Sequence, residues 1–274
     1  MNQTQDIRTG QSIELLKELH ILTRDGKLNQ DSRRKLKQVY HLFNFIEPLL
    51  NEIVKDEKDQ ISLVDHGAGK SYLGFILYDL FFKQLNYGKI YGIETREELV
   101  KKSTDLALKL KFNRMSFLNL SVEESIDSDR LPTTVDIVTA LHACDTATDD
   151  AIKFALKKNA RFMVLVPCCQ AEIATVLRKN KGKNLGTNVL TEIWRHPIHT
   201  REFGSQITNV LRCLELESRG YQVTVTELIG WEHSMKNELI IAQYKDLPRS
   251  RPRQRLESLL RELNLEEITH RFLV

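Results

Sequence analysis

The stretch ISLVDHGAGKSYLGFILYDLFF, residues 61–82, joins a short apolar run, a glycine turn and a long apolar segment. The run ISLVD is typical of a buried strand, and Gly67 and Gly69 follow it directly. Gly74 then lies in a segment long enough for a helix. A triphosphate loop of the G-x-x-x-x-G-K-[ST] kind would require glycine where this chain has Val64. The stretch therefore predicts a strand, a turn and a helix.

The same alternation continues along the chain. Apolar strand-like runs at 89–94, 114–120, 135–141 and 160–167 are separated by helix-like segments of ten or more residues. Such alternation indicates a parallel sheet that is covered on both faces. Two last runs, 221–230 and 237–244, are joined by only WEHSMK, which allows an antiparallel hairpin but no crossover helix. We predict an α/β fold: a Rossmann-like, doubly wound, seven-stranded sheet with an antiparallel terminal hairpin.

The flanking segments predict two additions to this sheet domain, which we place at residues 56–245. Residues 1–55 form an N-terminal helical extension, because apolar residues recur there every three or four positions. Its second helix, from residue 31, begins with an Asp-Ser cap signal. Residues 246–274 read as a basic, proline-broken linker followed by an amphipathic helix.

Composition limits the class of protein. The 274 residues are 41% hydrophobic, which is enough for a full core, and the formal net charge is only +3, so bulk charge does not predict nucleic-acid binding. Four cysteines are too few for a disulfide scaffold, and no run reaches about 18 apolar residues. We expect a soluble, cytoplasmic protein with no membrane or DNA partner.

The carboxyl ends of the strands are where doubly wound sheets bind ligands. Small residues after the first strand let a ligand lie against the backbone, and Glu94 at the end of the second can accept hydrogen bonds from ribose hydroxyls. Residues after the third strand could contact an adenine ring. Lys70 could face a cofactor carboxylate or be solvated. The candidate cofactor-binding residues are Asp65, Gly67, Gly69, Lys70, Glu94, Ser121, Val122, Glu123 and Leu141.

The order of glycine loop, acid and terminal hairpin resembles the class I S-adenosylmethionine-dependent methyltransferases. Four stretches are similar to the family called methyltransferase domain type 32, from about residue 33 to 243: ALHACDTATDDAI (140–152), VPCCQAE (166–172), ITNVLRCLELESRGY (207–221) and WEHSMKNELIIA (231–242). Its relatives include the methyltransferase-like 25 proteins and, distantly, acceptor-stem tRNA 2′-O-methyltransferases. Asp145 and Met235 depart from the family pattern. The resemblance implies S-adenosyl-L-methionine as cofactor and methyl transfer as activity.

The candidate catalytic residues follow the fourth and fifth strands: His142, Cys144, Asp145, Cys168 and Cys169. In the favoured interpretation His142 or Asp145 is a base or orienting group, and the cysteines shape the pocket. In a second, Cys168 or Cys169 attacks a pyrimidine ring.

A third interpretation has His142, Cys144, Cys168 and Cys169 bind zinc or an iron–sulfur cluster. We expect no metal, because no C-x-x-C pair exists and vicinal cysteines bind one metal awkwardly. Cys213 reads as a small buried hydrophobe.

Three local basic clusters bear on the substrate: RRKLK (33–37), RKNKGK (178–183) and RSRPRQR (249–255). On one face they would form a phosphate-binding surface of the kind that RNA requires. RNA methylation, of tRNA or rRNA, is therefore the expected reaction. Methylation of arginine or lysine in a protein is an alternative, as is a non-catalytic domain that binds S-adenosylmethionine within an assembly. The acceptor atom and the oligomeric state are not fixed by the sequence.

Overall fold

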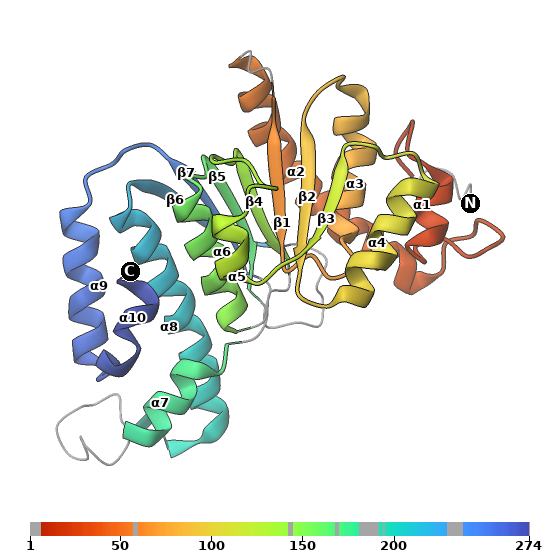
Figure 1. Ribbon diagram of the computed structural model, residues 1–274. Coiled ribbons are helices and arrows are strands. Elements are labelled where there is room, and N and C mark those ends of the chain that lie inside the picture. The colour runs from red at the N-terminus through yellow and green to blue at the C-terminus, as the bar shows by residue number, and fades with distance from the viewer. Residues whose placement is uncertain are drawn as a thin grey trace.

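Seven strands form a single sheet in the computed structural model, which describes residues 7–56, 60–141, 145–167, 170–180, 192–193, 195–228 and 238–273. The strand order is β3-β2-β1-β4-β5-β7-β6 (Figure 1). The strands are β1 Ser62–His66, β2 Lys89–Glu94, β3 Met115–Asn119, β4 Ile137–Leu141, β5 Phe162–Val166, β6 Tyr221–Glu227 and β7 Glu238–Tyr244.

The first five strands are parallel, and β7 lies antiparallel between β5 and β6. The strand order reverses between β1 and β4, which places the switch point of the doubly wound sheet beside the glycine turn. The sequence prediction of a doubly wound sheet with an antiparallel terminal hairpin is confirmed.

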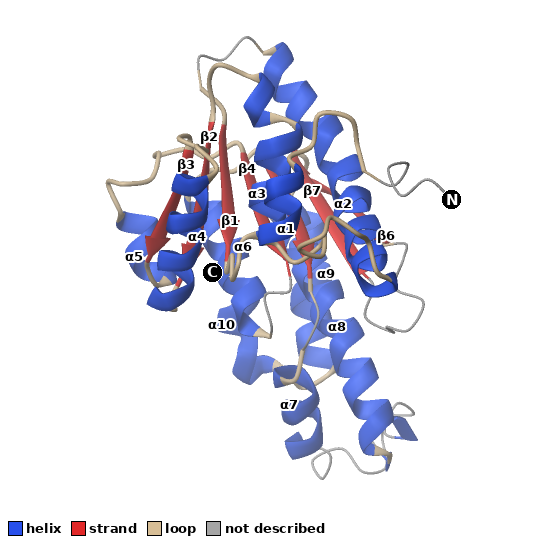
Figure 2. Ribbon diagram, turned by 90° about the vertical axis from the view of Figure 1, so that its right-hand side faces the viewer, coloured by secondary structure: helices blue, strands red, loops and turns tan. Residues whose placement is uncertain are grey.

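Helices cover both faces of the sheet (Figure 2). Beyond the carboxyl edge of the strands, α7 and the first part of α8 extend away from the sheet (Figure 1). The helices are α1 Ile13–Glu18, α2 Gln30–Lys55, α3 Tyr72–Leu80, α4 Glu97–Lys109, α5 Val122–Asp127, α6 Thr146–Lys157, α7 Glu172–Asn180, α8 Pro197–Ser218, α9 Ser250–Glu262 and α10 Thr269–Phe272, with short 3-10 turns at Phe82–Gln84 and Glu266–Ile268.

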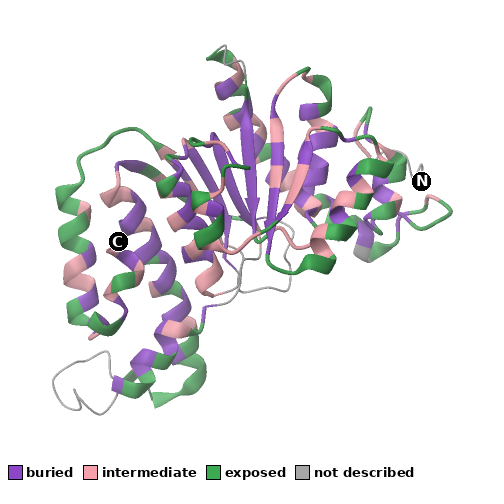
Figure 3. Cartoon of the chain, in the orientation of Figure 1, coloured by how far each residue is buried: buried purple, intermediate pink, exposed green. Residues whose placement is uncertain are grey.

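Two apolar layers lie on the faces of the sheet, and the central strands β1, β4 and β5 are almost fully buried, whereas the edge strand β6 is partly exposed (Figure 3). Leu63 and Ile90 face α1, α2 and α3, whereas Val64 and Ile93 face α5 and α6. This alternation is the period-two pattern of a sheet with two buried faces. None of the helices in the described part of the chain combines the length and apolarity needed to cross a bilayer.

The start of α2 differs from the expected one. The helix begins at Gln30, and the N-cap is Asn29, whose side-chain oxygen accepts the N–H of Ser32 at 2.8 Å. The Asp-Ser pair was therefore the wrong cap signal, because an Asn two residues earlier provides the acceptor that the first turn needs.

The C-terminal tail also differs from the expected linker. Most of the RSRPRQR cluster lies within α9, and Pro252 occupies the first turn, where its missing N–H costs no hydrogen bond. Leu256 and Leu260 of α9 pack with Leu211 and Leu214 of α8 in a third apolar cluster. The tail is therefore packed onto the body of the molecule through α8.

Candidate active site

A cavity of about 340 Å³ opens at the switch point, at the carboxyl ends of β1 and β2. Its volume lies in the range of small-molecule sites. The apolar part of the lining comes from Ile93, Leu120, Val122 and Ala147. The polar part comes from the glycine turn, the end of β2 and the first turns of α6, with His66, Glu94, Arg96 and Asp150 as its main side chains.

The glycine turn has the backbone that the sequence predicts. Gly67 and Gly69 have φ angles of +67° and +57°, in the left-handed region that glycine adopts without strain. Apart from its neighbours in the chain, no atom of the described residues lies within 4 Å of the position that a Cβ on Gly69 would take. The turn therefore leaves its outer side open to a ligand.

Glu94 is tied to this turn. Its Oε2 accepts the N–H of Gly69 at 2.9 Å, and its Oε1 accepts the backbone N–H of Arg96 at 3.0 Å. Burial raises the pKa of Glu94, but the hydrogen bonds from Arg96 and Gly69 outweigh burial, so this pKa lies below its usual value. Glu94 is therefore an ionised acceptor beside the turn.

The guanidinium of Arg96 lies across the Glu94 carboxylate. Its Nε donates to Oε1 at 3.0 Å and its Nη2 donates to Oε2 at 3.2 Å, while the Arg96 side chain is 61% exposed. With the two backbone donors, these bonds occupy the roughly four acceptor positions of the carboxylate. The Thr95 hydroxyl also donates to Oε1, at 3.4 Å, so a ligand that bonds to Glu94 through hydroxyl groups must displace one of these donors, and the exposed guanidinium of Arg96 is the one with most room to move.

His66 closes the inner end of the cavity. It is 6% exposed, and its ring packs against Phe154 of α6 with the centroids 5.5 Å apart. Neither ring nitrogen has a hydrogen-bond partner within the part of the chain that the structure describes. Burial lowers the pKa of His66 to about 4, and the nearby charge of Glu94 opposes this only partly. The imidazole is therefore neutral at pH 7.

Asp65 points to the other face of the sheet. It is buried, its Oδ1 accepts the hydroxyl of Thr139 at 2.9 Å, and its Oδ2 accepts that of Ser71 at 3.2 Å. Burial raises the pKa of Asp65 to about 6, although both hydrogen bonds lower it. The structure does not bring this carboxyl into the cavity with Glu94; it joins β1 to β4 and to the start of α3.

The remaining cofactor candidates are dispersed. Lys70 lines a different cavity, of about 440 Å³, beside α4, and Leu141 is half-buried at the end of β4. Ser121 caps α5, and Glu123 is exposed and paired with Lys153 at 3.4 Å. Of the three residues expected at the adenine ring, only Val122 lines the cavity at the switch point.

Asp145 follows β4 in the chain, and its side chain bonds to the segment that follows β5. Its backbone has φ +50° and ψ −121°, a conformation that favours glycine. Its Oδ1 accepts the N–H groups of Ala171 at 3.0 Å and Glu172 at 3.4 Å, at the start of α7. The side chain thus fixes the start of α7 to the start of α6, where Asp145 is the N-cap.

Arg212 of α8 bonds to Asp145 and to Asp149 in the first turn of α6. It is fully buried, and its Nε and Nη2 donate to the two carboxylate oxygens of Asp149 at 2.6 and 2.9 Å. Its Nη2 also donates to the carbonyl of Asp145 at 2.8 Å, and its Nη1 donates to Asn209 at 3.1 Å. A bidentate pair of this kind holds α8 and α6 in one arrangement.

The other expected catalytic residues, His142, Cys144, Cys168 and Cys169, lie outside the described residues. The base, nucleophile and metal interpretations therefore stay predictions. Cys213 of α8 is half-buried, and burial raises the pKa of its thiol to about 12, as expected of a packing residue.

Four residues of this region escaped the sequence reasoning. His66 lies inside the quoted glycine stretch, and its position next to Gly67 at a strand end was the signal that could have identified it. Arg96 follows Glu94 by two residues, but nothing in the sequence shows that its side chain turns back. Arg212 and Asp149 are 63 positions apart, so only the fold pairs them.

Comparison with known proteins gives distant relatives. The human glutathione S-transferase C-terminal domain-containing protein is 23% identical over 235 residues, which cover 80% of this chain and 34% of that protein. The homologue from Drosophila pseudoobscura is 23% identical over 220 residues, which cover 73% of this chain and 36% of its own length. The chain thus aligns with about a third of the length of these relatives.

Comparison with solved structures also finds matches at low identity. The SAH-bound methyltransferase PaMTH1 of Podospora anserina is 13% identical, with a TM-score of 0.46 and coverage of 88% of this chain and 89% of that one. An rRNA methylase from Streptococcus thermophilus is 11% identical, with a TM-score of 0.41 and coverage of 68% and 88%.

The family itself is shown by a sequence model described as "Methyltransferase domain", which matches residues 34–176. The match spans α2, the five parallel strands, the glycine turn and Glu94, and includes the loops after β4 and β5. It ends within α7, before α8 and the terminal hairpin, where two of the resembling stretches lie. With this match over half of its length, the chain belongs to the methyltransferase domain family.

Proposed function

We propose that this domain transfers a methyl group from S-adenosylmethionine to RNA. The family implies this methyl donor, and the residues at the switch point fit it. The cavity of about 340 Å³ is of suitable size for a nucleoside, and it holds a buried imidazole whose nitrogens lack partners among the described residues. An ionised Glu94 lies beside a glycine turn with open space on its outer side.

Different residues of the chain would bind different parts of the cofactor. Glu94 would accept hydrogen bonds from the ribose hydroxyls after Arg96 moves aside, and the glycine turn would let the ligand approach the backbone. Ile93, Leu120 and Val122 provide an apolar wall for the base. When bound, S-adenosylmethionine supplies an activated methyl group, so the protein has chiefly to align the acceptor with it.

One observation supports RNA as the acceptor: exposed basic side chains flank the cofactor edge on two sides. Arg34, Lys35 and Lys37 lie in the first turns of α2, and Arg178 and Lys179 lie in α7, where Lys179 also forms an exposed ion pair with Glu267 at 2.9 Å. A short connection joins the end of α2 to the start of β1, so its first turns lie toward the carboxyl edge, whereas α7 extends beyond this edge (Figure 1). Such flanking charges suit a phosphate backbone.

The third basic cluster lies elsewhere. Arg249 neighbours Gly220 at the start of β6, beside the amino end of β5. It also forms an ion pair with Asp246 at 2.7 Å. The first turn of α9 therefore lies away from the cofactor edge and offers a matched control for the two flanking groups.

The test supplies methyl-labelled S-adenosylmethionine to the protein with an RNA fraction and a protein fraction prepared from the same cells. We expect label in RNA. Reversing charge with Arg34→Glu and Lys35→Glu should weaken RNA binding and reduce the slope of log affinity against log salt by about 2, since each residue would no longer neutralise a phosphate. Reversing the charges of Arg251 and Arg253 in α9 should leave the RNA affinity and its salt dependence unchanged. Label in protein alone would refute the RNA assignment and favour protein methylation.

A further inference from the structure

We propose that His66 is the polar anchor for the adenosine half of the cofactor, which it holds through hydrogen bonds from its neutral imidazole. This inference rests on the proposed use of S-adenosylmethionine. It assigns a positioning role to a residue that lies one place before the glycine turn, at the end of β1.

The position of the ring supports this role. Asp65 and His66 are adjacent in β1, so their side chains leave opposite faces of the sheet. Asp65 enters the layer beneath α3, whereas His66 lines the cavity together with Glu94 at the neighbouring strand end. A ribose held at Glu94 would place its base next to this lining.

The lack of partners is the second observation. Buried polar atoms in folded proteins almost always have hydrogen-bond partners, and each exception requires an explanation. Both nitrogens of His66 are exceptions among the described residues, although the ring is 6% exposed. Phe154, which packs on the ring, offers no conventional donor or acceptor. Both nitrogens are shielded from solvent in the free protein, so a rotation of the ring toward the cavity would let a ligand there supply the missing partners.

The chemistry of the ring matches a nucleobase. Because burial lowers the pKa of His66 to about 4, the imidazole carries one N–H donor and one acceptor at neutral pH. Adenine presents amino donors beside ring-nitrogen acceptors, so a neutral imidazole can serve either. The methionine half carries full charges, for which a neutral ring is a poor partner. Ile93, Leu120 and Val122 line the same cavity with apolar surface suited to a flat base.

This role implies a trade-off between stability and binding. In the free protein, the unpaired nitrogens cost stability, so an apolar residue of similar volume should stabilise the fold. The same residue should weaken cofactor binding because it cannot form the hydrogen bonds. If His66 were only a structural residue, its replacement by an apolar residue would destabilise the protein without specifically weakening cofactor binding.

The test compares His66→Leu with His66→Gln, which keeps a donor and an acceptor at similar size. We expect His66→Leu to raise the melting temperature of the free protein and to weaken S-adenosylhomocysteine binding about tenfold by calorimetry. The loss should be the same for methylthioadenosine, which lacks the amino-acid half. His66→Gln should retain most of the affinity.

A spectroscopic readout keeps the inference testable if a variant does not fold. The ¹⁵N shifts of the His66 ring should change when S-adenosylhomocysteine is added to the wild-type protein. Unchanged ring shifts, or equal affinity of wild type and His66→Leu, would overturn the role of His66 alone. Absence of S-adenosylhomocysteine binding to the wild type would instead refute the proposed cofactor use.

Discussion

Arg212→Met should cause a large loss of stability, because it removes the guanidinium that forms an ion pair with the buried carboxylate of Asp149, while the charge of Arg271 acts on Asp149 only without a direct ion pair among the described residues. The Arg212 side chain is 0% exposed and that of Asp149 is 8% exposed. Leaving one partner of such a pair unpaired costs about 3–5 kcal/mol. For a chain of this size, that corresponds to a decrease in melting temperature of roughly 10 °C.

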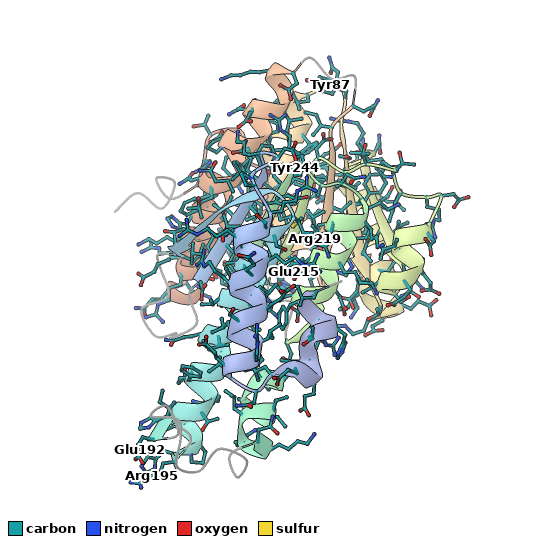
Figure 4. The ribbon with its side chains drawn as sticks, turned by 90° about the vertical axis from the view of Figure 1, so that its left-hand side faces the viewer. Tyr87, Glu192, Arg195, Glu215, Arg219 and Tyr244 are labelled. Carbon is teal, nitrogen blue, oxygen red and sulfur yellow. The ribbon has the colours of Figure 1, made fainter. Side chains whose placement is uncertain are left out.

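Neighbouring groups increase this cost. Glu215 on the same helix is also buried, and burial, together with the charge of Asp149, raises its pKa well above the usual value. Arg212 lowers the pKa of Glu215, as does Arg219, which lies one turn away (Figure 4). Without Arg212, two carboxyl groups would share a poorly solvated region with less compensation.

The assay is urea-induced unfolding of the single variants and of Arg212→Met combined with Asp149→Leu. Removing both charges should recover most of the loss, because a buried pair contributes little over well-packed apolar residues. A coupling energy of a few kcal/mol is expected from the cycle. If Arg212→Met loses less than about 1 kcal/mol, the assignment of a buried, fully desolvated pair is incorrect.

Three other changes test separate parts of the site. Arg96→Ala should tighten binding of S-adenosylhomocysteine roughly threefold by calorimetry, because the Glu94 carboxylate is released; weaker binding would mean that Arg96 itself holds the cofactor. The pKa of Asp65 is raised to about 6, so its contribution to the free energy of unfolding is full below about pH 3.8 and is lost as the pH rises to 6. The pKa of His66 is lowered to about 4, so its contribution is full above pH 6.5 and is lost as the pH falls to 4. Each contribution is on the order of 3 kcal/mol, and the two change in opposite directions with pH, so they offset each other in the wild type. Asp65→Asn removes the first contribution, so its free energy of unfolding, measured by urea titration, should fall between pH 6.5 and 4. A flat pH profile in that variant would contradict the two shifts. Cys213 should resist alkylation at pH 8 in the folded protein, since burial raises its pKa to about 12, and peptide mapping by mass spectrometry would show early modification if this is wrong.

The sequence predicted the sheet well because each strand leaves a local mark. The run from Ile61 to Asp65 is apolar and short, and the connection WEHSMK is too short for a crossover helix. Both features act over a few residues, so they can be recognised in one chain. The glycine turn and Glu94 were predicted for the same reason, and the structure joins them by a hydrogen bond of 2.9 Å.

The rest of the site depends on contacts between distant segments. The direction of Asp65 follows from the register of β1 with β4, where Thr139 accompanies it. Lys70 was expected to face either a cofactor carboxylate or solvent, and in the structure it lines the cavity beside α4, next to the turn at Ser71 with φ +49°. No local pattern encodes these directions.

The pairing of charged side chains also depends on the fold, as the region between α7 and α8 shows. Glu192 and Arg195 form an exposed ion pair at 3.3 Å there, far from the sheet (Figure 4). Sequence clusters of charge give no information about which charges pair locally and which face a substrate. The three basic clusters looked equivalent in the sequence, and the fold separates the one in α9 from the other two.

Calorimetric titration with S-adenosylmethionine, S-adenosylhomocysteine and ATP tests the central claim most directly. We expect micromolar binding of the first two ligands, none of ATP, and a loss of about 1–3 kcal/mol in Glu94→Ala, because charged hydrogen bonds to the ribose are removed. Binding of ATP alone would contradict the account and would return the GKS sequence after the glycine turn to a phosphate-binding role.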